Sequence, residues 1–322
     1  MTAPFHVPDN VHLLGPQRLR PTLRPALDRN NIGSRIATVT AGWEEREGED
    51  SELRAHVGRE VVDLRIWARL EKVFAEDRAL HDAMRERYDQ VRILRGLYQR
   101  QLAHVLASAR ELLDAQQSQP TDLQAKALEA SIEAVRLIDQ RHSEHVAEIH
   151  ESYRERIDAG QYPSLLRERD ELRAVLESCS ALCIAGGHVA ILLNRLRALG
   201  VLDAAAQMPI FAWSAGAMVL TENVVLFHDF PPQGAGDSEV LEPGFGVVRG
   251  VVLLPHATRR LRLTDPVRVA LFARRFAPAR AIALDDGAGF ELQRERVAVA
   301  AGTRLLCADG SVVALKAEEH AA

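Results

Sequence analysis

A serine stands at a sharp change of secondary structure in residues 209–220. The sequence there, PIFAWSAGAMVL, is a short apolar strand followed at once by a Ser-Ala-Gly turn and the start of a helix. Such a turn lifts the serine out of the edge of the sheet, and Gly216 lets the helix stay close behind it. Ala212 stands where the better-known nucleophile elbow has its first glycine. The pattern favours a nucleophilic Ser214, and small-residue packing at a strand-to-helix junction is the alternative.

A pair of glycines follows an earlier apolar strand. Residues 182–188 read LCIAGGH and lead into the helical run VAILLNRLRALG. Backbone N–H groups at the carboxyl end of a strand can face a ligand, so Gly186 and Gly187 could form an oxyanion hole that the N–H of Ala215 completes. A tight turn that needs positive φ would also select glycine here. The sequence leaves both explanations open.

A histidine follows a third apolar strand. Residues 251–263 read VVLLPHATRRLRL, so His256 comes directly after the strand and before a basic run. At the end of a strand in the same sheet as Ser214, its imidazole could take the proton of the serine hydroxyl. Histidines in loops are also commonly structural. We predict that His256 lies in the same sheet as Ser214 and is the leading candidate for the base.

The elements that must position these residues fall into three parts. Residues 1–34 carry five prolines and scattered arginines, which predicts an extended arm without regular structure. Residues 66–179 favour helix and have apolar side chains at three- and four-residue steps, which predicts long helices packed together. From Ala181 onward, short apolar strands alternate with helices, as in a mostly parallel sheet.

This order predicts a discontinuous domain. Strands at residues 35–41 and 61–64 are too few to form a stable sheet, so we expect them to join the later strands. The predicted core is residues 35–65 together with residues 180–322, a three-layer α/β domain with a mostly parallel sheet. Residues 66–179 are then a long α-helical insertion, which is a candidate surface for a homodimer.

Composition excludes several classes of protein. The chain has 322 residues, of which 47% are hydrophobic and 26% charged, as expected of a globular protein. A formal charge of −5 argues against a broad surface for nucleic acid. The chain starts without a signal-peptide pattern, and no stretch approaches about 18 apolar residues, so we expect no membrane span and a cytoplasmic location. We attribute the excess of arginine over lysine to a GC-rich bacterial genome.

Two further polar groupings could in principle hold a metal or a cation. Acidic residues follow the first strand, at the edge where ligands collect in open α/β sheets, namely Glu44, Glu45, Glu47, Glu49 and Asp50. Three potential ligands share one helical face, namely His142, His145 and Glu148. We interpret the first group as a solvated charged loop and the second as a polar helix surface. We therefore predict no metal and no cofactor.

Four motifs together resemble one peptidase family. They are GGH at 186–188, WSAGAM at 213–218, PH at 255–256 and LDDGAG at 284–289. They are similar to the serine peptidase family of aspartyl dipeptidase (peptidase E) and cyanophycinase, within the class I glutamine amidotransferase-like superfamily. The resemblance covers residues 35–64 and 180–315. It implies a flavodoxin-like α/β fold and a serine hydrolase that cleaves an amide bond in a small peptide or an isopeptide.

The resemblance also assigns roles to residues of this chain. It implies that Ser214 is the nucleophile and His256 its base. In the dipeptidase branch an aspartate soon after the serine orients the histidine, which maps to Asp229, whereas in the cyanophycinase branch the acid follows the next strand, which maps to Asp286. One carboxylate must accept from the far imidazole nitrogen, and the sequence leaves both candidates open. We favour Asp286 slightly, because its strand should end at the same sheet edge.

Substrate contacts are implied at three positions. His188 stands where the dipeptidase form has an asparagine, and Arg259 and Arg260 lie where cyanophycinase-like proteins have arginines. Both branches act on aspartyl substrates, so we hypothesise that Arg259 or Arg260 pairs with a substrate carboxylate. A glutamine amidotransferase proper would need a cysteine in place of Ser214. The alternative function is a catalytically inactive protein that acts in binding or assembly through its helical insertion.

Overall fold

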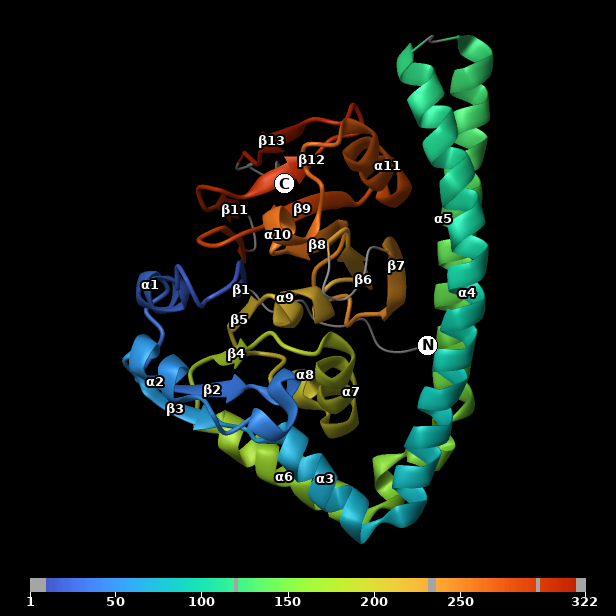
Figure 1. Cartoon of the computed structure of the whole chain (residues 1–322). Helices are drawn as coiled ribbons and strands as arrows, with labels where there is room; N and C mark the ends of the chain where they lie inside the picture. The colour runs from blue at the N-terminus through green and yellow to red at the C-terminus, as the bar shows by residue number, and fades with distance from the viewer. Residues whose placement is uncertain (1–9, 119–120, 231–235, 294–295, 317–322) are drawn as a thin grey trace.

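The computed structural model describes residues 10–118, 121–230, 236–293 and 296–316 (Figure 1). Five parallel strands form most of the central sheet: β1 (Asn10–Leu14), β2 (Arg35–Val39), β3 (Glu60–Asp63), β4 (Leu182–Ile184) and β5 (Ile210–Trp213). Two antiparallel strands extend it, β10 (Gly289–Gln293) and β11 (Arg296–Val299). The order is β11-β10-β1-β5-β4-β2-β3. The predicted mixed α/β architecture with a mostly parallel sheet is confirmed, and the early strands do join the later ones.

Two smaller sheets follow in the chain. An antiparallel pair consists of β6 (Asn223–His228) and β7 (Gly236–Pro243). A four-stranded sheet contains β8 (Val251–Pro255), β9 (Arg280–Leu284), β12 (Arg304–Leu306) and β13 (Val312–Ala314), in the order β13-β12-β9-β8. The prediction that His256 follows a strand of the same sheet as Ser214 is therefore wrong. The β6–β7 pair comes between the two segments, and β8 pairs with β9 instead of with the central sheet.

Helices cover both faces of the central sheet. On one face lie α1 (Leu23–Arg29) and α2 (Ser51–Val57), which pack with strand residues such as Cys183 and Phe211. The neighbouring residues Ile184 and Ala212 point to the other face, as alternation along a strand requires. That face packs with α3 (Ile66–Glu76), α6 (Pro163–Glu177), α7 (Val189–Leu199) and α8 (Val201–Ala204). The core therefore has three layers.

Short helices complete the connections. Three are 3₁₀ helices, η1 (Ala41–Arg46), η2 (Glu155–Ile157) and η3 (Ala159–Gln161). Two more short helices are α9 (Ala215–Val219) after β5 and α10 (Ala257–Arg260) after β8, and the longer α11 (Pro266–Phe276) precedes β9. Because α9 and α10 begin directly after strand ends, each places the residue before it, Ser214 or His256, at the rim of a sheet.

Residues 10–34 do not form the predicted extended arm, and that prediction is wrong for them. β1 lies inside the central sheet, paired with β5 on one side and β10 on the other. Pro16 and Pro21 lie in the connection between β1 and α1, and Pro25 lies in the first turn of α1, where a backbone N–H is not needed. The prolines thus separate regular elements rather than exclude them. Residues 1–9 of the predicted arm lie outside the described residues.

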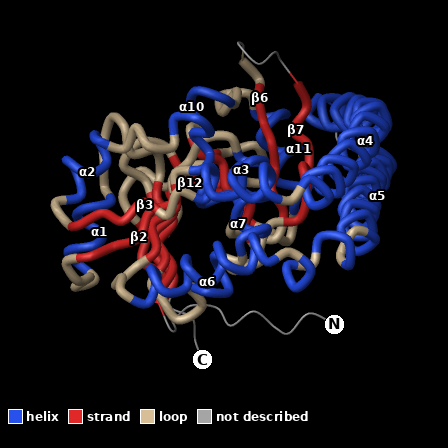
Figure 2. The backbone as a smooth tube through the Cα atoms, turned by 90° about the horizontal axis from the view of Figure 1, so that it is seen from below, coloured by secondary structure: helices blue, strands red, loops and turns tan. Residues whose placement is uncertain are grey.

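The helical hairpin, as we call α4 (Arg78–Ser118) and α5 (Asp122–Ser152), runs beside the core (Figures 1 and 2). The Tyr98 ring stacks on the His142 ring with a centroid distance of 4.1 Å between the two helices. Within the predicted insertion 66–179, α3 and α6 instead pack on α7 and α8 as part of a core layer. The hairpin lies outside these three layers and packs against β7 and α11. No helix in the described ranges has both the length and the apolar character needed to cross a membrane.

Candidate active site

Ser214 sits in a strained turn between β5 and α9. Its backbone has φ 51° and ψ −124°, which non-glycine residues rarely adopt. Its carbonyl accepts hydrogen bonds from the N–H groups of Ala217 and Met218, which start α9. A Cβ at Gly216 would lie 2.3 Å from the carbonyl oxygen of Ile184, so only glycine allows α9 to approach β4 this closely. The local sequence therefore forms a tight strand-to-helix turn with Ser214 between β5 and α9.

His256 reaches this hydroxyl from the second sheet. The distance between Ser214 Oγ and His256 Nε2 is 3.4 Å. His256 also has a left-handed backbone, with φ 58°, and its N–H donates to the carbonyl of Leu284 at 3.1 Å. A long contact of this kind is common in free enzymes and shortens when substrate binds. Two residues from different sheets, both in strained conformations, thus meet at one point.

The surroundings of His256 favour a neutral imidazole. Burial lowers the pKa of His256, and the positive charge of Arg260 lowers it further. The carboxylate of Asp286 acts in the opposite direction but does not outweigh these effects. A neutral imidazole with Nε2 facing the hydroxyl can accept a proton from it near neutral pH.

The glycine turn after β4 lies directly against Ser214. A Cβ at Gly186 would come within 2.7 Å of the Ser214 Cβ, and a Cβ at Gly187, where φ is 118°, would come within 2.3 Å of the carbonyl oxygen of Gly42. Gly187 therefore needs glycine for conformation, as a tight turn requires. Within the described part of the chain, the N–H groups of Gly187 and Ala215 donate no hydrogen bond. Both N–H groups thus remain free to bind a ligand.

His188 is the first residue after the glycine turn. Its N–H donates to the carbonyl of Gly42 at 2.7 Å, and its Nδ1 accepts from the N–H of Ile191 at 3.3 Å. The side chain thus caps the start of α7 while remaining exposed. A contact between His188 and substrate stays a prediction.

The two candidate acids have different surroundings. Asp229 is buried and accepts from the Arg262 N–H at 2.9 Å and from the Arg268 guanidinium at 2.5 Å. Asp286 is more exposed, pairs with Arg259 at 3.6 Å and contributes a negative potential at His256. Among the described residues no hydrogen bond joins a carboxylate to the imidazole Nδ1. Of the two carboxylates, Asp286 therefore has the weaker interaction with its other partner, a single ion pair with Arg259.

A third carboxylate, Asp285, lies beside Asp286 but has other partners. Its oxygens accept from the Thr258 N–H at 2.9 Å, the Thr258 hydroxyl at 2.8 Å and the Arg304 guanidinium at 2.6 Å. These contacts join the start of α10 to β12. Neither Arg304 nor Arg268 could be assigned to this region from the sequence, because an arginine on a distant strand or helix carries no local signal of which residue it will contact.

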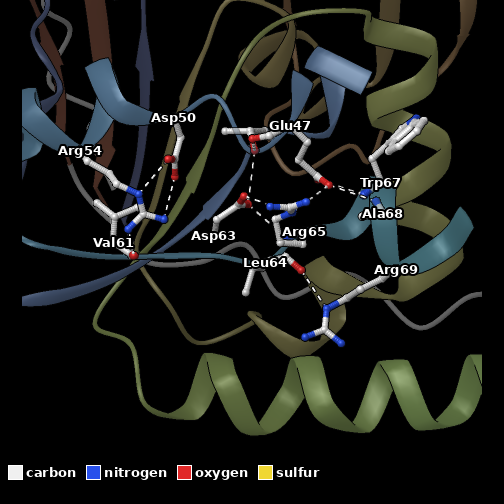
Figure 3. Close-up of polar contacts among 11 residues, drawn as sticks. Glu47, Asp50, Arg54, Val61, Asp63, Leu64, Arg65, Trp67, Ala68 and Arg69 are labelled. Carbon is white, nitrogen blue, oxygen red and sulfur yellow. Dashed lines mark hydrogen bonds and ion pairs between the residues drawn. The ribbon is translucent and has the colours of Figure 1, made fainter. Parts of the chain in front are cut away.

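The acidic loop after β2 is structural rather than simply solvated (Figure 3). Glu47 is buried and accepts from the N–H groups of Trp67 and Ala68, both at 3.0 Å, so it caps α3. Asp50 is also buried and accepts from Arg54 Nε at 2.8 Å. Burial raises the pKa of Glu47 although both N–H groups oppose this. In the described ranges no cluster of three or more side chains is suited to hold a metal.

Comparison with known proteins yields structural neighbours only. No protein-family model and no curated protein sequence matches the chain. It is similar in structure to a peptidase from an acI-B1 Actinobacterium, with 13% identity and a TM-score of 0.47 over 98% of each chain. It is also similar to a candidate peptidase E protein from Listeria monocytogenes EGD-e, with 10% identity and a TM-score of 0.43 over 90% of this chain and 97% of that one. Similarity at this level identifies no activity.

Proposed function

We propose that the protein is a serine-type amidohydrolase that cleaves an amide bond in a small peptide or an isopeptide. The observation that carries the proposal is the strained turn at Ser214, with its Oγ 3.4 Å from the Nε2 of His256. A backbone conformation that costs about 1–3 kcal/mol persists only where the surrounding structure enforces it, and such positions cluster at active sites. Two of the four motifs that resemble the peptidase E and cyanophycinase family, WSAGAM and PH, contain the same two residues.

The proposed reaction begins when the Ser214 hydroxyl attacks the carbonyl carbon of the scissile amide. His256 Nε2 takes the hydroxyl proton, and the N–H groups of Gly187 and Ala215 donate to the oxyanion that forms. The imidazolium then gives its proton to the leaving amine as the carbon–nitrogen bond breaks. Water releases the acyl group by the same steps. We assign Asp286 to stabilise the imidazolium, because Asp229 is already bound by Arg268.

A fluorophosphonate probe tests the nucleophile without knowledge of the substrate. We expect stoichiometric labelling of Ser214, located by mass spectrometry of the digested protein, and no labelling of a Ser214→Ala variant. Ser180, two residues before β4, provides the control, because Ser180→Ala should label as the wild type does. Absence of labelling under conditions that modify a known serine hydrolase would exclude the proposed serine-hydrolase function. It would favour the alternative, a protein that uses the fold for binding or assembly.

The arginines after His256 suggest an acidic substrate. The Arg260 guanidinium is half-buried beside the imidazole, and burial lowers its pKa. Among the described residues it has no ion-pair or hydrogen-bond partner, whereas Arg259 already pairs with Asp286. A guanidinium held in this way is well suited to receive a carboxylate in its planar fork. We therefore assign the substrate carboxylate to Arg260 rather than to Arg259.

Protection from the probe measures this preference. Short peptides with an aspartyl residue should slow the labelling of Ser214 at concentrations about tenfold lower than the matching asparaginyl peptides, since a charge-assisted hydrogen bond contributes about 1.5–3 kcal/mol. Arg260→Gln should remove the difference. Arg262→Gln, which removes the exposed charge two residues later, should retain it. Equal protection by both peptides in the wild type would contradict the assignment.

A further inference from the structure

We propose that the helical hairpin positions the catalytic histidine through a line of four charged side chains. The line runs from Arg110 on α4 through Asp237 and Arg268 to Asp229, which holds the backbone just after His256. The inference rests on the proposed function, because it makes the hairpin a part of the apparatus that aligns His256 with Ser214. It also makes Asp229 a positioning residue rather than the acid of the triad.

The first step is a pair of hydrogen bonds between Asp229 and residues 256–262, which we call the histidine segment. The Asp229 carboxylate accepts from the Arg262 N–H at 2.9 Å, and the Asp229 N–H donates to the Arg260 carbonyl at 2.7 Å. α10 has only four residues, so its own hydrogen bonds cannot hold it firmly. Asp229 thus fixes the backbone at the end of the histidine segment that lies farthest from His256 in sequence.

The second step is the anchor of Asp229 itself. Asp229 is buried, and a buried carboxylate needs a partner for its charge. Arg268 on α11 supplies that partner at 2.5 Å, and its other terminal nitrogen lies 3.3 Å from an Asp237 oxygen. The same Asp237 oxygen accepts from Arg110 of α4 at 2.6 Å. Four side chains from α4, β7, α11 and the end of β6 therefore form one alternating row of charges.

The third step is that β7 is held by the hairpin along its length. Arg95 and Gln99 of α4 bind Glu239, and the Tyr98 hydroxyl accepts from the Val240 N–H at 3.0 Å. His142 of α5 contacts the Leu241 carbonyl through Nε2 at 3.1 Å. Figure 2 shows β6 and β7 side by side next to the hairpin. β6 pairs with β7 and ends at His228, directly before Asp229. The contacts of the hairpin with β7 therefore also fix the position of Asp229 and of the histidine segment that it binds.

The expected size of the effect follows from the geometry of proton transfer. The Ser214–His256 distance of 3.4 Å is already long for a hydrogen bond, and displacement of a catalytic group by about 1 Å can cost about 100-fold in rate. Loss of Arg268, whose side chain is mostly but not fully buried, should therefore lower the rate of fluorophosphonate labelling by about tenfold or more. Loss of the half-exposed Arg110 should lower it by about two- to fivefold, since exposed ion pairs are weak.

The experiment compares Arg268→Gln and Arg110→Gln with Arg92→Gln, a control on α4 whose exposed arginine pairs with Asp89 one turn away. Two quantities are measured on the full chain: the rate of Ser214 labelling, and the hydrogen exchange of backbone amides in residues 257–262. We expect slower labelling and faster exchange in the first two variants, unchanged values in Arg92→Gln, and recovery in Arg110→Lys. The thermal midpoint of Arg110→Gln should stay close to that of the wild type.

The outcomes separate this inference from the proposed function. Unchanged exchange in residues 257–262 of Arg110→Gln overturns the coupling, whatever the labelling shows. Faster exchange with unchanged labelling overturns the positioning role. If the wild type is not labelled at all, the proposed function fails, and the exchange comparison alone decides whether the hairpin holds the histidine segment. If Arg268→Gln does not fold, the comparison of Arg110→Gln with Arg110→Lys is sufficient to test the inference.

Discussion

Replacing His256 with glutamine should lower the rate at which fluorophosphonate modifies Ser214 by about 1,000-fold or more. Loss of the base from a serine–histidine pair leaves a hydroxyl that must lose its proton to water, and single replacements of this kind cost several powers of ten. Glutamine keeps a polar side chain of similar length, so the turn between β8 and α10 should persist. The second-order labelling rate at neutral pH is the measurement.

The matched control is His228→Gln. This imidazole lies at the end of β6, and partial burial and the charge of Arg260 lower its pKa too. Among the described residues, however, the Ser214 hydroxyl is hydrogen-bonded to His256 and not to His228. Its replacement should change the labelling rate by less than about twofold. A similar rate in His256→Gln and the wild type would exclude His256 as the base.

The pH dependence of labelling checks the same assignment. The base acts only when neutral, so the rate should rise with pH and level off above the pKa of His256. Burial and Arg260 lower that pKa, so the midpoint should lie below about 6.5, the ordinary value for histidine. Arg260→Gln removes the larger of the two arginine charges that lower this pKa and should move the midpoint upward.

Replacing Arg275 with methionine should lower the free energy of unfolding by about 3–5 kcal/mol. Arg275 on α11 is buried and donates to both carboxylate oxygens of Asp139 on α5, each at 2.6 Å, as well as to the Ser238 carbonyl at 2.6 Å. Removal of one partner leaves a buried charge without compensation, and that penalty is larger than the net contribution of the pair. Equilibrium denaturation by urea, followed by circular dichroism, gives the value.

The double variant Arg275→Met with Asp139→Leu provides the control. Replacing both members of a buried pair with apolar side chains of similar volume is often close to neutral, so most of the lost free energy should return. A loss below about 1 kcal/mol in the single variant would show that the hairpin does not depend on this pair. A double variant no more stable than the single one would show that the hydrogen bond to Ser238 matters more than the charges.

The local motifs around the site could be read from the sequence, because each depends on adjacent residues. The strand followed by Ser214 and Gly216 specifies a turn by sterics alone, and the same holds for the glycines after β4. Their approach to His256 could be anticipated only in part. The sequence places a histidine after a strand, but the choice of sheet depends on pairing between distant segments, which no local pattern encodes.

Burial of polar residues was the main feature hidden from the sequence. Glu47 belongs to an acidic run, and His142 lies on a charged helix, yet both are buried and have partners far along the chain. Charge alone predicts solvent exposure, because burial of an ionisable group is costly unless a partner compensates it. The partners of Glu47 are backbone N–H groups at the start of α3, and these appear only once the fold has brought them together.

The place of β1 in the sheet also determines when this protein can complete its fold during synthesis. Val11 and Leu13 are buried between β5 and β10, which follow β1 in the chain by about 200 and about 275 residues, respectively. Until β5 is made, β1 has neither of its two partners in the sheet, while the hairpin helices can form from local contacts alone. The emerging chain therefore carries β1 as an apolar, unpaired strand throughout the synthesis of the hairpin.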